Sequence, residues 1–391
     1  TVLTCFPNFP RGKLYAGYRQ KPWQRETMDG IEVIRLPTYI ARNEGFLRRT
    51  LDFMSFMVVG VLASFFVRRP DVVVATSPQF FTAVAGWIVG ALKRRPFVFE
   101  LGDLWPASIV AVGAMKSSRV LRAMERFELF LYHKASVVVA LTSAFKRNLV
   151  SRGVPEEKIV VVINGVDLSR YQPQAPCETL INEWQLRNKL VVGYVGTHGM
   201  AHQLENVIQA AEILEGKSSV HFLFVGDGAC KRELQSRALA ANLSNVSFAA
   251  PRPKEDMPNV WSVCDIALIH LKDDPAFAEV IPSKMFEAMG MGKPLLLVSP
   301  VGEAKAILDS TGAGEWVPAA CPDLLAHKIE SLRIDKVRLA QLADASRKAA
   351  SHYSRDRQAS DMLRALNLSV RQYSDSGVDL PDSSNTEGAK D

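Results

Sequence analysis

Short, uninterrupted runs of apolar residues recur along the chain, separated by stretches with helical spacing or by turns. Nine of these runs predict buried strands, at residues 71–76, 96–101, 136–141, 158–163, 190–195, 220–225, 245–250, 264–269 and 294–299. Strands that are apolar on both faces are typical of parallel sheets covered by helices on both sides. The pattern therefore predicts an α/β protein built on parallel sheets.

A polar, proline-bearing stretch from Asp167 to Asn188 divides these strands into a group of four and a group of five. The division predicts two doubly wound, Rossmann-like lobes joined by a linker. We place the first lobe at residues 1–165, the linker at 166–188 and the second lobe at 189–335.

Two helices are predicted after the last strand, at residues 336–350 and 355–368, with Ser354 as the N-cap between them. We expect the segment 336–369 to pack back toward the first lobe. The polar, acidic tail at residues 370–391 is predicted to be disordered.

The beginning of the sequence departs from this scheme. Residues 1–4 predict a strand that joins a loop, whereas a doubly wound lobe usually opens with a strand, a glycine-rich turn and a helix. We therefore expect the first lobe to lack its opening strand and helix.

Composition narrows the class of protein. Of 391 residues, 48% are hydrophobic and 23% are charged, which excludes a disordered or low-complexity chain. The five cysteines are spread singly, so a disulfide framework or zinc ribbon is not expected, and a reducing cytosol is favoured. No histidine spacing or motif indicates a metal site or a serine hydrolase.

Charge is distributed unevenly along the chain. Residues 1–165 carry 23 Lys and Arg against 12 Asp and Glu, whereas residues 166–391 carry 24 against 29. The basic first part indicates an anionic surface or ligand facing the first lobe, and such attraction should weaken at high salt.

Two apolar stretches in the first lobe are flanked by basic residues. Leu51–Val67 lies between two arginine pairs, and Phe81–Leu92 is followed by Lys93-Arg94-Arg95. The first stretch has three interpretations: a buried helix of the lobe, a helix lying in a membrane interface, or a transmembrane helix, for which it is short of the usual ~20 residues.

The most informative segment begins at Glu279 and reads E-V-I-P-S-K-M-F-E-A-M-G-M-G-K-P. Pro282 suits the first turn of a helix, and Gly290 or Gly292 suits its end. This helix would begin at the carboxyl edge of a parallel sheet, where free N–H groups and the helix dipole favour a phosphate.

The charged residues of this helix predict the ligand. Lys284, which follows Ser283 in the first turn, adds a positive charge. Glu287 and Glu279 lie on either side and suggest sugar hydroxyls, because a carboxylate accepts two hydrogen bonds from a diol. The alternative is a solvated helix with unremarkable charges.

Two further strand ends are candidate sites. Gly196-Thr197-His198-Gly199 opens onto a helix and is predicted to contact phosphate, with a plain tight turn as the alternative. Asp103 follows a buried strand and faces the cleft between the lobes, where it would orient a sugar or take a proton from an acceptor hydroxyl; alternatively, it caps the next helix. The turn at Gly226-Asp227-Gly228 is interpreted as structural.

These motifs resemble those of the retaining glycosyltransferases of family 4, which have the two-lobed GT-B fold with a cleft between the lobes. The resemblance runs from Thr1 to about Leu368. It rests on the E-x7-E signature and on G-K-P, N-G-V-D and V-G-D-G, which stand at residues 279–287, 292–294, 164–167 and 225–228. TCFPNFPRGKLYAGY, DLWP and PSKMFE are similar to the branch that builds bacterial O-antigen, capsule and colanic acid, which includes fucosamine transferases.

The resemblance implies transfer of a hexose or aminosugar from a UDP- or GDP-sugar, with retention and without a metal or cofactor. Asp103, Glu279 and Lys284 are the implied catalytic residues, and Glu287 is implied to hold the ribose. Gly196, Thr197, His198, Gly199 and Ser283 complete the implied substrate-binding set. The family's usual Arg and Lys after the second lobe's first strand are absent, so Lys284 is expected to be the principal phosphate cation.

The implied acceptor is a glycan on a polyprenyl diphosphate, with an anionic membrane surface as a further partner and no nucleic acid. The expected location is cytoplasmic and peripheral, on the inner face of the plasma membrane. Two alternatives are a nucleotide-sugar epimerase, which would act on the donor alone, and a non-catalytic nucleotide-sugar binder. The N-G-V-D junction and the E-x7-E run favour the transferase.

Overall fold

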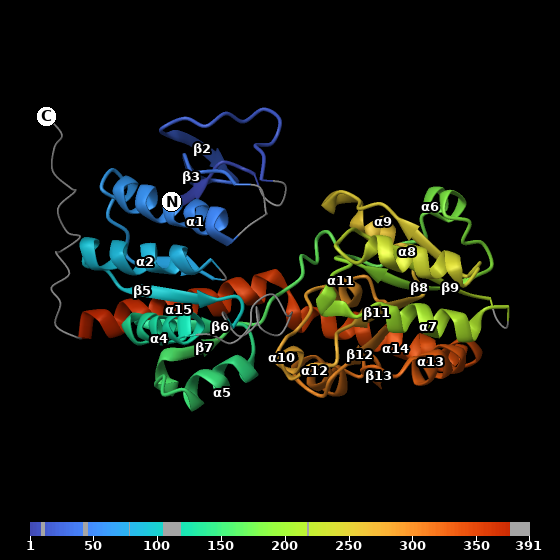
Figure 1. The fold of residues 1–391 in the computed structure, drawn as a ribbon. Helices are drawn as coiled ribbons and strands as arrows, with labels where there is room; N and C mark the ends of the chain where they lie inside the picture. Colours follow the sequence, from blue (N-terminus) through green and yellow to red (C-terminus); the bar gives the residue numbers. More distant parts are fainter. Residues whose placement is uncertain (9–11, 42–45, 78, 105–118, 217–218, 376–391) are drawn as a thin grey trace, which may run out of the picture.

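The computed structural model describes residues 1–391 except 9–11, 42–45, 78, 105–118, 217–218 and 376–391. All nine predicted strands are present, in two parallel sheets that belong to two lobes lying side by side (Figure 1). The predicted two-lobed α/β architecture is confirmed.

The second lobe is built on a six-stranded parallel sheet in the order β10-β9-β8-β11-β12-β13. Its strands are β8 (Leu190–Val195), β9 (Val220–Val225), β10 (Val246–Ala249), β11 (Ile266–His270), β12 (Leu295–Ser299) and β13 (Gly314–Pro318). The strand order reverses between the neighbours β8 and β11, which is where doubly wound sheets open a ligand-binding crevice. The sequence analysis missed β13, because this edge strand is polar: its Glu315 pairs with Lys328 and Arg338 at 3.3 and 2.8 Å.

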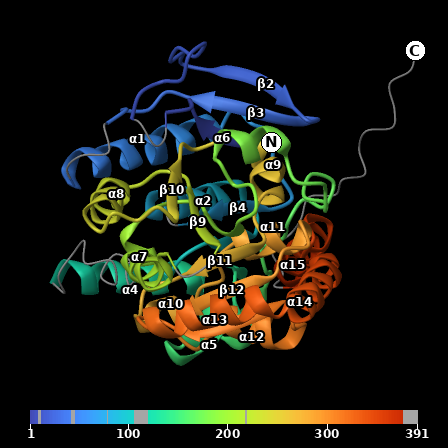
Figure 2. The same cartoon turned by 90° about the vertical axis from the view of Figure 1, so that its right-hand side faces the viewer.

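Helices cover both faces of this sheet, and successive strand residues serve the two faces in turn. Val191 and Val195 of β8 face a core with Trp261 and Phe286, whereas Tyr194 faces the opposite core. Figure 2 shows β11 and β12 between α11 and α13. The helices are α7 (Glu205–Leu214), α8 (Lys231–Ala240), α9 (Met257–Ser262), α10 (Pro275–Ala278), α11 (Lys284–Gly290), α12 (Glu303–Thr311), α13 (Pro322–Ile334) and α14 (Lys336–Ala350).

The strands of the first lobe form two sheets. β4 (Val73–Thr76), β5 (Phe97–Leu101), β6 (Val137–Ala140) and β7 (Ile159–Val161) are parallel neighbours. A second sheet has the order β1-β3-β2, from β1 (Val2–Cys5), β2 (Gln24–Met28) and β3 (Ile31–Leu36). The predicted strand at 1–4 is thus confirmed as β1. The β2–β3 hairpin was not predicted; it turns at Asp29-Gly30, where both residues have positive φ (50° and 79°), as a type I′ turn requires.

Among the described residues that precede the linker, the helices beside these sheets are α1 (Phe46–Ser64), α2 (Phe80–Lys93), α4 (Arg119–Lys134) and α5 (Ser143–Ser151). The two apolar stretches singled out in the sequence are therefore α1 and α2, and α1 packs on α2. Among the described residues, no helix is long and apolar enough to cross a membrane.

The two lobes are joined twice. The linker leaves β7, contains α6 (Glu178–Glu183) and packs on the second lobe through Tyr171 and Leu180. The chain returns through Ser354, whose side chain accepts a hydrogen bond from the Arg357 N–H at 3.2 Å, as predicted for an N-cap. From there α15 (Arg355–Asp375) runs along the first lobe (Figure 1).

Two expectations about the C-terminal segment are corrected. Only α15 reaches the first lobe, where Ala365 joins the core around Val137; α14 packs on the second lobe through Leu342. Residues 370–375, expected to be disordered, are the last turns of α15. They follow Ser369, which is buried and shares a 2.6 Å hydrogen bond with Ser136. Residues 376–391 lie outside the described chain.

The crossing of the two connections predicts an effect on stability. A Cβ on Gly165 would lie 2.3 Å from the Ser354 carbonyl oxygen, a backbone atom fixed by the bridge between Val166 and Ser354. We expect Gly165→Ala to lower the free energy of unfolding by about 1–3 kcal/mol, the usual cost of overpacking. Gly60→Ala is the control, because a Cβ there meets nothing within 4 Å and the residue lies in α1. Denaturant unfolding of both variants checks this, and equal stabilities would contradict it.

Candidate active site

The loop after β8 and the start of α11 meet at the point where the strand order reverses. Two glycines of the turn after β9 support this loop. A Cβ on Gly226 would lie 1.9 Å from the Gly196 oxygen, and one on Gly228 would lie 2.4 Å from the His198 oxygen. The V-G-D-G segment is therefore a backbone support, as the sequence analysis interpreted it.

Lys284, the first residue of α11, places a cation in this region. Its Nζ is buried, lies 3.9 Å from the centre of the Tyr194 ring and has no hydrogen-bond partner among the described residues. Burial lowers the pKa of Lys284 to about 7, and the nearby Glu287 opposes this shift only in part. A buried ammonium without a partner is costly, so the position is built for an anion.

Gly196 makes room for this ammonium. It has φ +134°, and a Cβ there would lie 3.1 Å from Lys284 Nζ. The structure thus brings Gly196 and Lys284, two of the residues selected in the sequence, close together. Thr197 is exposed beside them, and Gly199 is half-buried. Ser283 is exposed and occupies the N-cap position of α11 without making a side-chain capping bond.

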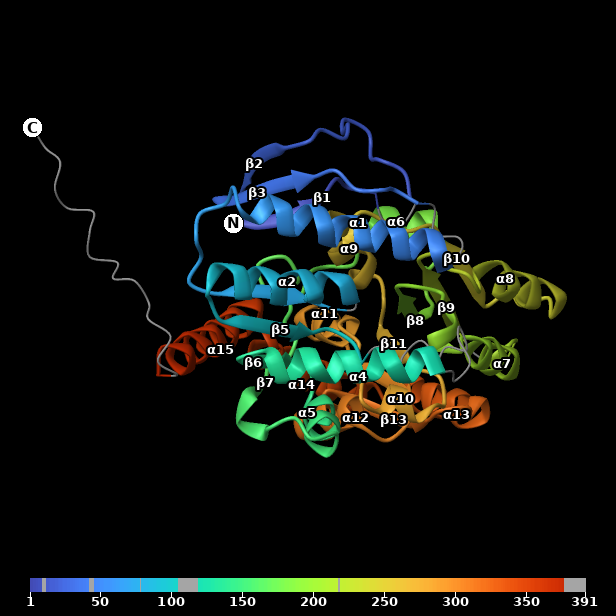
Figure 3. The ribbon, with the colours of Figure 1, turned by 60° about the vertical axis from the view of Figure 1, so that its left-hand side comes forward.

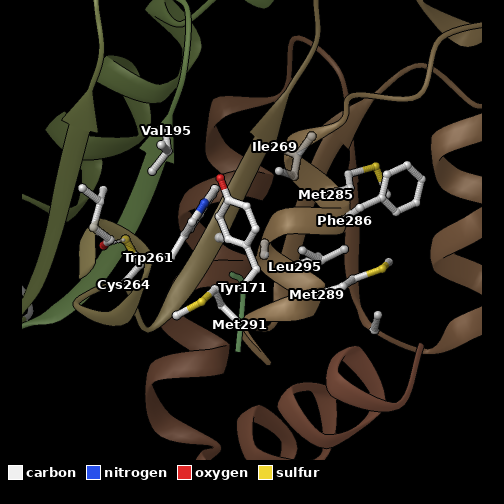
Figure 4. Packing of buried hydrophobic residues seen from close by; sticks show 14 of the residues in the cluster. Tyr171, Val195, Trp261, Cys264, Ile269, Met285, Phe286, Met289, Met291 and Leu295 are labelled. Atoms are coloured by element: carbon white, nitrogen blue, oxygen red, sulfur yellow. Dashed lines mark hydrogen bonds between the residues drawn. The ribbon is translucent and has the colours of Figure 1, made fainter. Parts of the chain in front are cut away.

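Glu287 lies one turn further along α11 and is held by two donors that the sequence analysis missed. The Trp261 indole N–H donates to Oε2 over 3.3 Å, and the Tyr171 hydroxyl donates to the same carboxylate. Burial, together with this carboxylate, raises the pKa of Tyr171. Figure 4 shows the Tyr171 hydroxyl beside the Trp261 nitrogen. Two donors leave lone pairs free on Glu287, so the carboxylate is oriented and can still accept hydrogen bonds.

No sequence pattern linked these residues to Glu287. Tyr171 belongs to the linker and Trp261 to α9, and both reach α11 through packing of the core. Gly290 permits the approach, because a Cβ there would lie 3.0 Å from the Tyr171 Cβ. The helix ends at Gly290, one of the two expected glycines, and Gly292 follows the C-cap residue Met291 with φ +64°.

Glu279 lies at the end of α10 and contacts the first lobe. Thr142 donates from its hydroxyl to the Glu279 carbonyl oxygen at 3.0 Å, and the Asn148 side chain bonds the carboxylate. Burial raises the pKa of Glu279, and Glu303 adds to the effect, whereas Asn148 and Arg147 oppose it. Arg147 also pairs with Glu303 at 2.8 Å. The two glutamates of the E-x7-E signature thus have separate surroundings, one between the lobes and one inside the second lobe.

His198 is corrected from a phosphate contact to a packing residue. Its side chain is 0% exposed and lies against the rings of Tyr194, Phe224 and Phe248, with centroids 5.8–6.3 Å apart. The backbone N–H of His198 donates to the backbone oxygen of Asp227, and the backbone carbonyl of His198 accepts from the Cys230 N–H, both at 2.9 Å. Burial, with Lys231 and Lys284, lowers the pKa of His198 to about 4, so the ring is neutral at pH 7.

Two more imidazoles that the sequence analysis did not select surround Lys284. His202 Nδ1 lies 3.1 Å from the His270 carbonyl oxygen. Burial lowers the pKa of His202 to about 4 and that of His270 to about 3, and Lys284 contributes to both shifts. Because His198, His202 and His270 are neutral at pH 7, the positive charge beside these rings comes from Lys284.

Asp103 follows β5 in the first lobe. The preceding Gly102 N–H donates to the Ser77 hydroxyl at 3.0 Å. Asp103 is one of the charges that raise the pKa of the buried Tyr132, after burial and Glu128. Trp105 and Pro106 lie outside the described residues, and the role of Asp103 stays a prediction.

Comparison with known proteins identifies the class. Residues 1–165 match the family described as "Glycosyl transferase 4-like domain", and residues 178–350 match "Glycosyl transferases group 1". The chain is a glycosyltransferase made of these two domains. The interval between the two matches falls within the linker expected at 166–188.

Curated relatives of this glycosyltransferase come from bacteria. It is 26% identical to WcaI of Escherichia coli K12, which is named for colanic acid biosynthesis. The match spans 300 residues and covers 74% of this chain and 73% of WcaI. It is 26% identical over 270 residues to the glycosyltransferase WbjE of Pseudomonas aeruginosa, covering 68% of this chain and 66% of WbjE.

Solved structures share the fold of this glycosyltransferase. HepE from Anabaena, solved with UDP and glucose, aligns with a TM-score of 0.67 over 83% of each chain at 21% identity. Sucrose-phosphate synthase from Thermosynechococcus elongatus aligns with a TM-score of 0.72 over 93% of this chain and 87% of its own, at 16% identity. These neighbours confirm the GT-B fold.

The buried ammonium predicts a gain in stability when it is removed. We expect Lys284→Met to raise the free energy of unfolding at pH 7 by about 1–3 kcal/mol, because the substitution removes the free-energy cost of burying an unpaired charge. An unfolded lysine binds its proton up to about pH 10.4, whereas folded Lys284 loses it near pH 7. The wild-type penalty is therefore full below pH 7 and fades as the pH rises toward 10.

Urea unfolding from pH 6 to 10 measures this effect. Lys348→Met is the matched control, since that side chain is 71% exposed and paired with Asp344. A Lys284→Met protein no more stable than the wild type at pH 7 would show that the ammonium is not an uncompensated charge.

Proposed function

We propose that this glycosyltransferase moves a hexose or aminosugar from a nucleotide diphosphate sugar to a glycan acceptor in bacterial surface polysaccharide synthesis. The observation that carries the proposal is the buried ammonium of Lys284, which no described residue pairs by a hydrogen bond, beside the oriented carboxylate of Glu287. A cation for a diphosphate and an acceptor for hydroxyls, one helical turn apart, match the two polar parts of such a donor.

The donor's diphosphate would take the place that Lys284 Nζ leaves unpaired, against the loop at Gly196, with Thr197, Gly199 and Ser283 at its edge. Glu287 would accept hydrogen bonds from the ribose. Support for a UDP-type donor comes from HepE, which was solved with UDP and glucose. Support for the polysaccharide comes from WcaI, named for colanic acid biosynthesis, and TuaH, named for teichuronic acid biosynthesis. A role as a fucosamine transferase is part of this proposal.

In the transfer step, negative charge grows on the leaving diphosphate, and Lys284 would stabilise it electrostatically. Glu279, at the boundary between the lobes, would contact the donor sugar, and Asp103 would orient the acceptor or take the proton from its hydroxyl. Transfer with retention and without a metal ion belongs to this proposal.

The acceptor would be a glycan carried on a polyprenyl diphosphate. The basic first lobe supports this assignment, because its excess of Lys and Arg suits an anionic lipid surface. The enzyme would then work in the cytoplasm as a peripheral protein on the inner face of the plasma membrane.

The role of Lys284 gives a kinetic prediction. Lys284→Ala should lower kcat by about 10²–10³-fold and affect donor affinity less, because the charge it stabilises is largest in the transition state. Turnover assays with the donor and a lipid-linked acceptor test this, with activity expected to persist in EDTA. A strict requirement for a divalent ion, or conversion of the donor without an acceptor, would overturn the proposal.

The role of Glu287 gives a graded prediction for binding. Glu287→Ala should weaken donor binding by about 1.5–3 kcal/mol, as expected for a charged hydrogen bond, and Tyr171→Phe by about 0.5–1.5 kcal/mol, as expected when one orienting donor is lost. Calorimetry with the nucleotide diphosphate measures both, and thermal melting confirms that each variant is folded. Arg187→Ala, an exposed site in the linker, is the control. Wild-type affinity in Glu287→Ala would refute the assignment.

A further inference from the structure

The outward face of α1 is apolar and exposed. Leu51, Met54, Val58 and Leu62 recur every three or four residues and therefore share one face of the helix, and Phe65 directly follows its last residue, Ser64. Their exposed fractions are 54%, 39%, 50%, 57% and 60%. We call these five residues the α1 stripe. A continuous apolar row at this level of exposure is unusual for a protein that meets only water.

The inner face of α1 is fully used in holding the helix on the lobe. Ala63 joins the core of Ile34 and Leu36 in β3, with Val59 and Val67 packed against it. Met57 packs on the core that includes Ala83 of α2. The second half of the helix is thus anchored, and the stripe cannot turn inward without breaking these core contacts.

Basic groups mark both ends of the stripe. Arg48 and Arg49 precede it and Arg68 and Arg69 follow it. Arg69 is fixed by hydrogen bonds to the Lys93 and Arg94 carbonyl oxygens at 2.8 and 3.2 Å, while Arg68 is exposed. The single carboxylate of α1, Asp52, accepts a bond from the Ala41 N–H at 3.4 Å.

The neighbouring helices continue this surface. Figure 3 shows α1, α2 and α4 running along the same side of the first lobe. At the end of α2, Leu92 is 51% exposed beside Lys93, and on α4 Phe127 is 37% exposed directly after the exposed Arg126. Apolar side chains bordered by cations suit a bilayer with anionic headgroups.

We propose that α1 lies in the interface of an anionic membrane, with the α1 stripe inserted among the acyl chains and the flanking arginines at the headgroups. The proposal deepens the function proposed above, since it gives the surface through which this enzyme would meet a lipid-linked acceptor. It also changes the expected salt response. Charge alone should be released at high salt, whereas inserted apolar side chains keep part of the binding.

Two variants separate these contributions. The stripe variant carries Val58→Ser, Leu62→Ser and Phe65→Ser, and the arginine variant carries Arg48→Ser, Arg49→Ser and Arg68→Ser. The control carries Leu239→Ser and Val337→Ser, at positions of the second lobe that are 79% and 70% exposed. Each protein is sedimented with vesicles of phosphatidylethanolamine and phosphatidylglycerol, or of phosphatidylcholine alone, at low salt and at about 1 M salt.

We expect the wild type and the control to bind anionic vesicles about tenfold more tightly than neutral ones at low salt, and to stay partly bound at high salt. The stripe variant should lose the salt-resistant part and bind about tenfold more weakly overall, while the arginine variant loses mainly the salt-sensitive part. Thermal melting and nucleotide binding should be unchanged in both.

Wild-type sedimentation of the stripe variant would overturn the proposal. So would a wild-type dimer, seen by light scattering, that the stripe variant converts to a monomer without a change in vesicle binding. If vesicle binding fails but nucleotide binding and turnover of a water-soluble acceptor persist, the membrane surface is wrong and the proposed function stands. If nucleotide binding fails while the vesicle results hold, the proposed function is wrong instead.

Discussion

The ammonium of Lys284 is buried over the ring of Tyr194 and has no hydrogen-bond partner in the part of the chain that the structure describes, and several elements of the second lobe meet around it. Gly196 leaves the space that a side chain would take. The V-G-D-G turn packs closely against the backbone of the Gly196 loop. The imidazoles of His198, His202 and His270 are kept neutral by burial and by the lysine itself. The result is a concentrated positive charge that only an incoming anion can satisfy.

The second constraint is the position of Glu287 relative to this charge. α11 fixes the spacing along the chain, but the direction of the carboxylate depends on Trp261 and Tyr171. Tyr171 belongs to the linker, which links the geometry of the site to the junction between the lobes. That junction is tight, because the chain crosses it at Val166 and Ser354 with backbone atoms in contact. Glu279 touches α5 across the same boundary, so both glutamates are placed by contacts that involve more than one part of the fold.

In the first lobe, apolar residues lie both in the core and on the surface. Buried residues pack between α15 and the parallel sheet, while the α1 stripe and the flanking arginines face outward. Under the two proposals, donor chemistry and membrane contact belong to separate lobes, and the basic charge lies on the lobe that carries the apolar stripe.

The sequence by itself determined the strands, the two lobes and the segment that carries the candidate site. Nine apolar runs were sufficient, because a strand buried on both faces needs apolar residues at nearly every position. Lys284, Glu287 and the Gly196 loop followed from their places at strand ends and helix starts. The polar edge strand β13 and the β2–β3 hairpin escaped this reasoning, since neither forms an apolar run.

Only the tertiary structure decided which side chains meet. Trp261 and Tyr171 reach Glu287 through packing between elements distant in the sequence, and no local spacing records that contact. His198 was misjudged because its loop position suggested a ligand, whereas its ring fills a space among Tyr194, Phe224 and Phe248. The apolar segment at Leu51–Val67 left three interpretations open, and the structure supports an amphipathic helix on the lobe surface. The physical reason is the same in each case. The burial of a side chain depends on which other elements pack against it, and the periodicity of its own segment does not specify them.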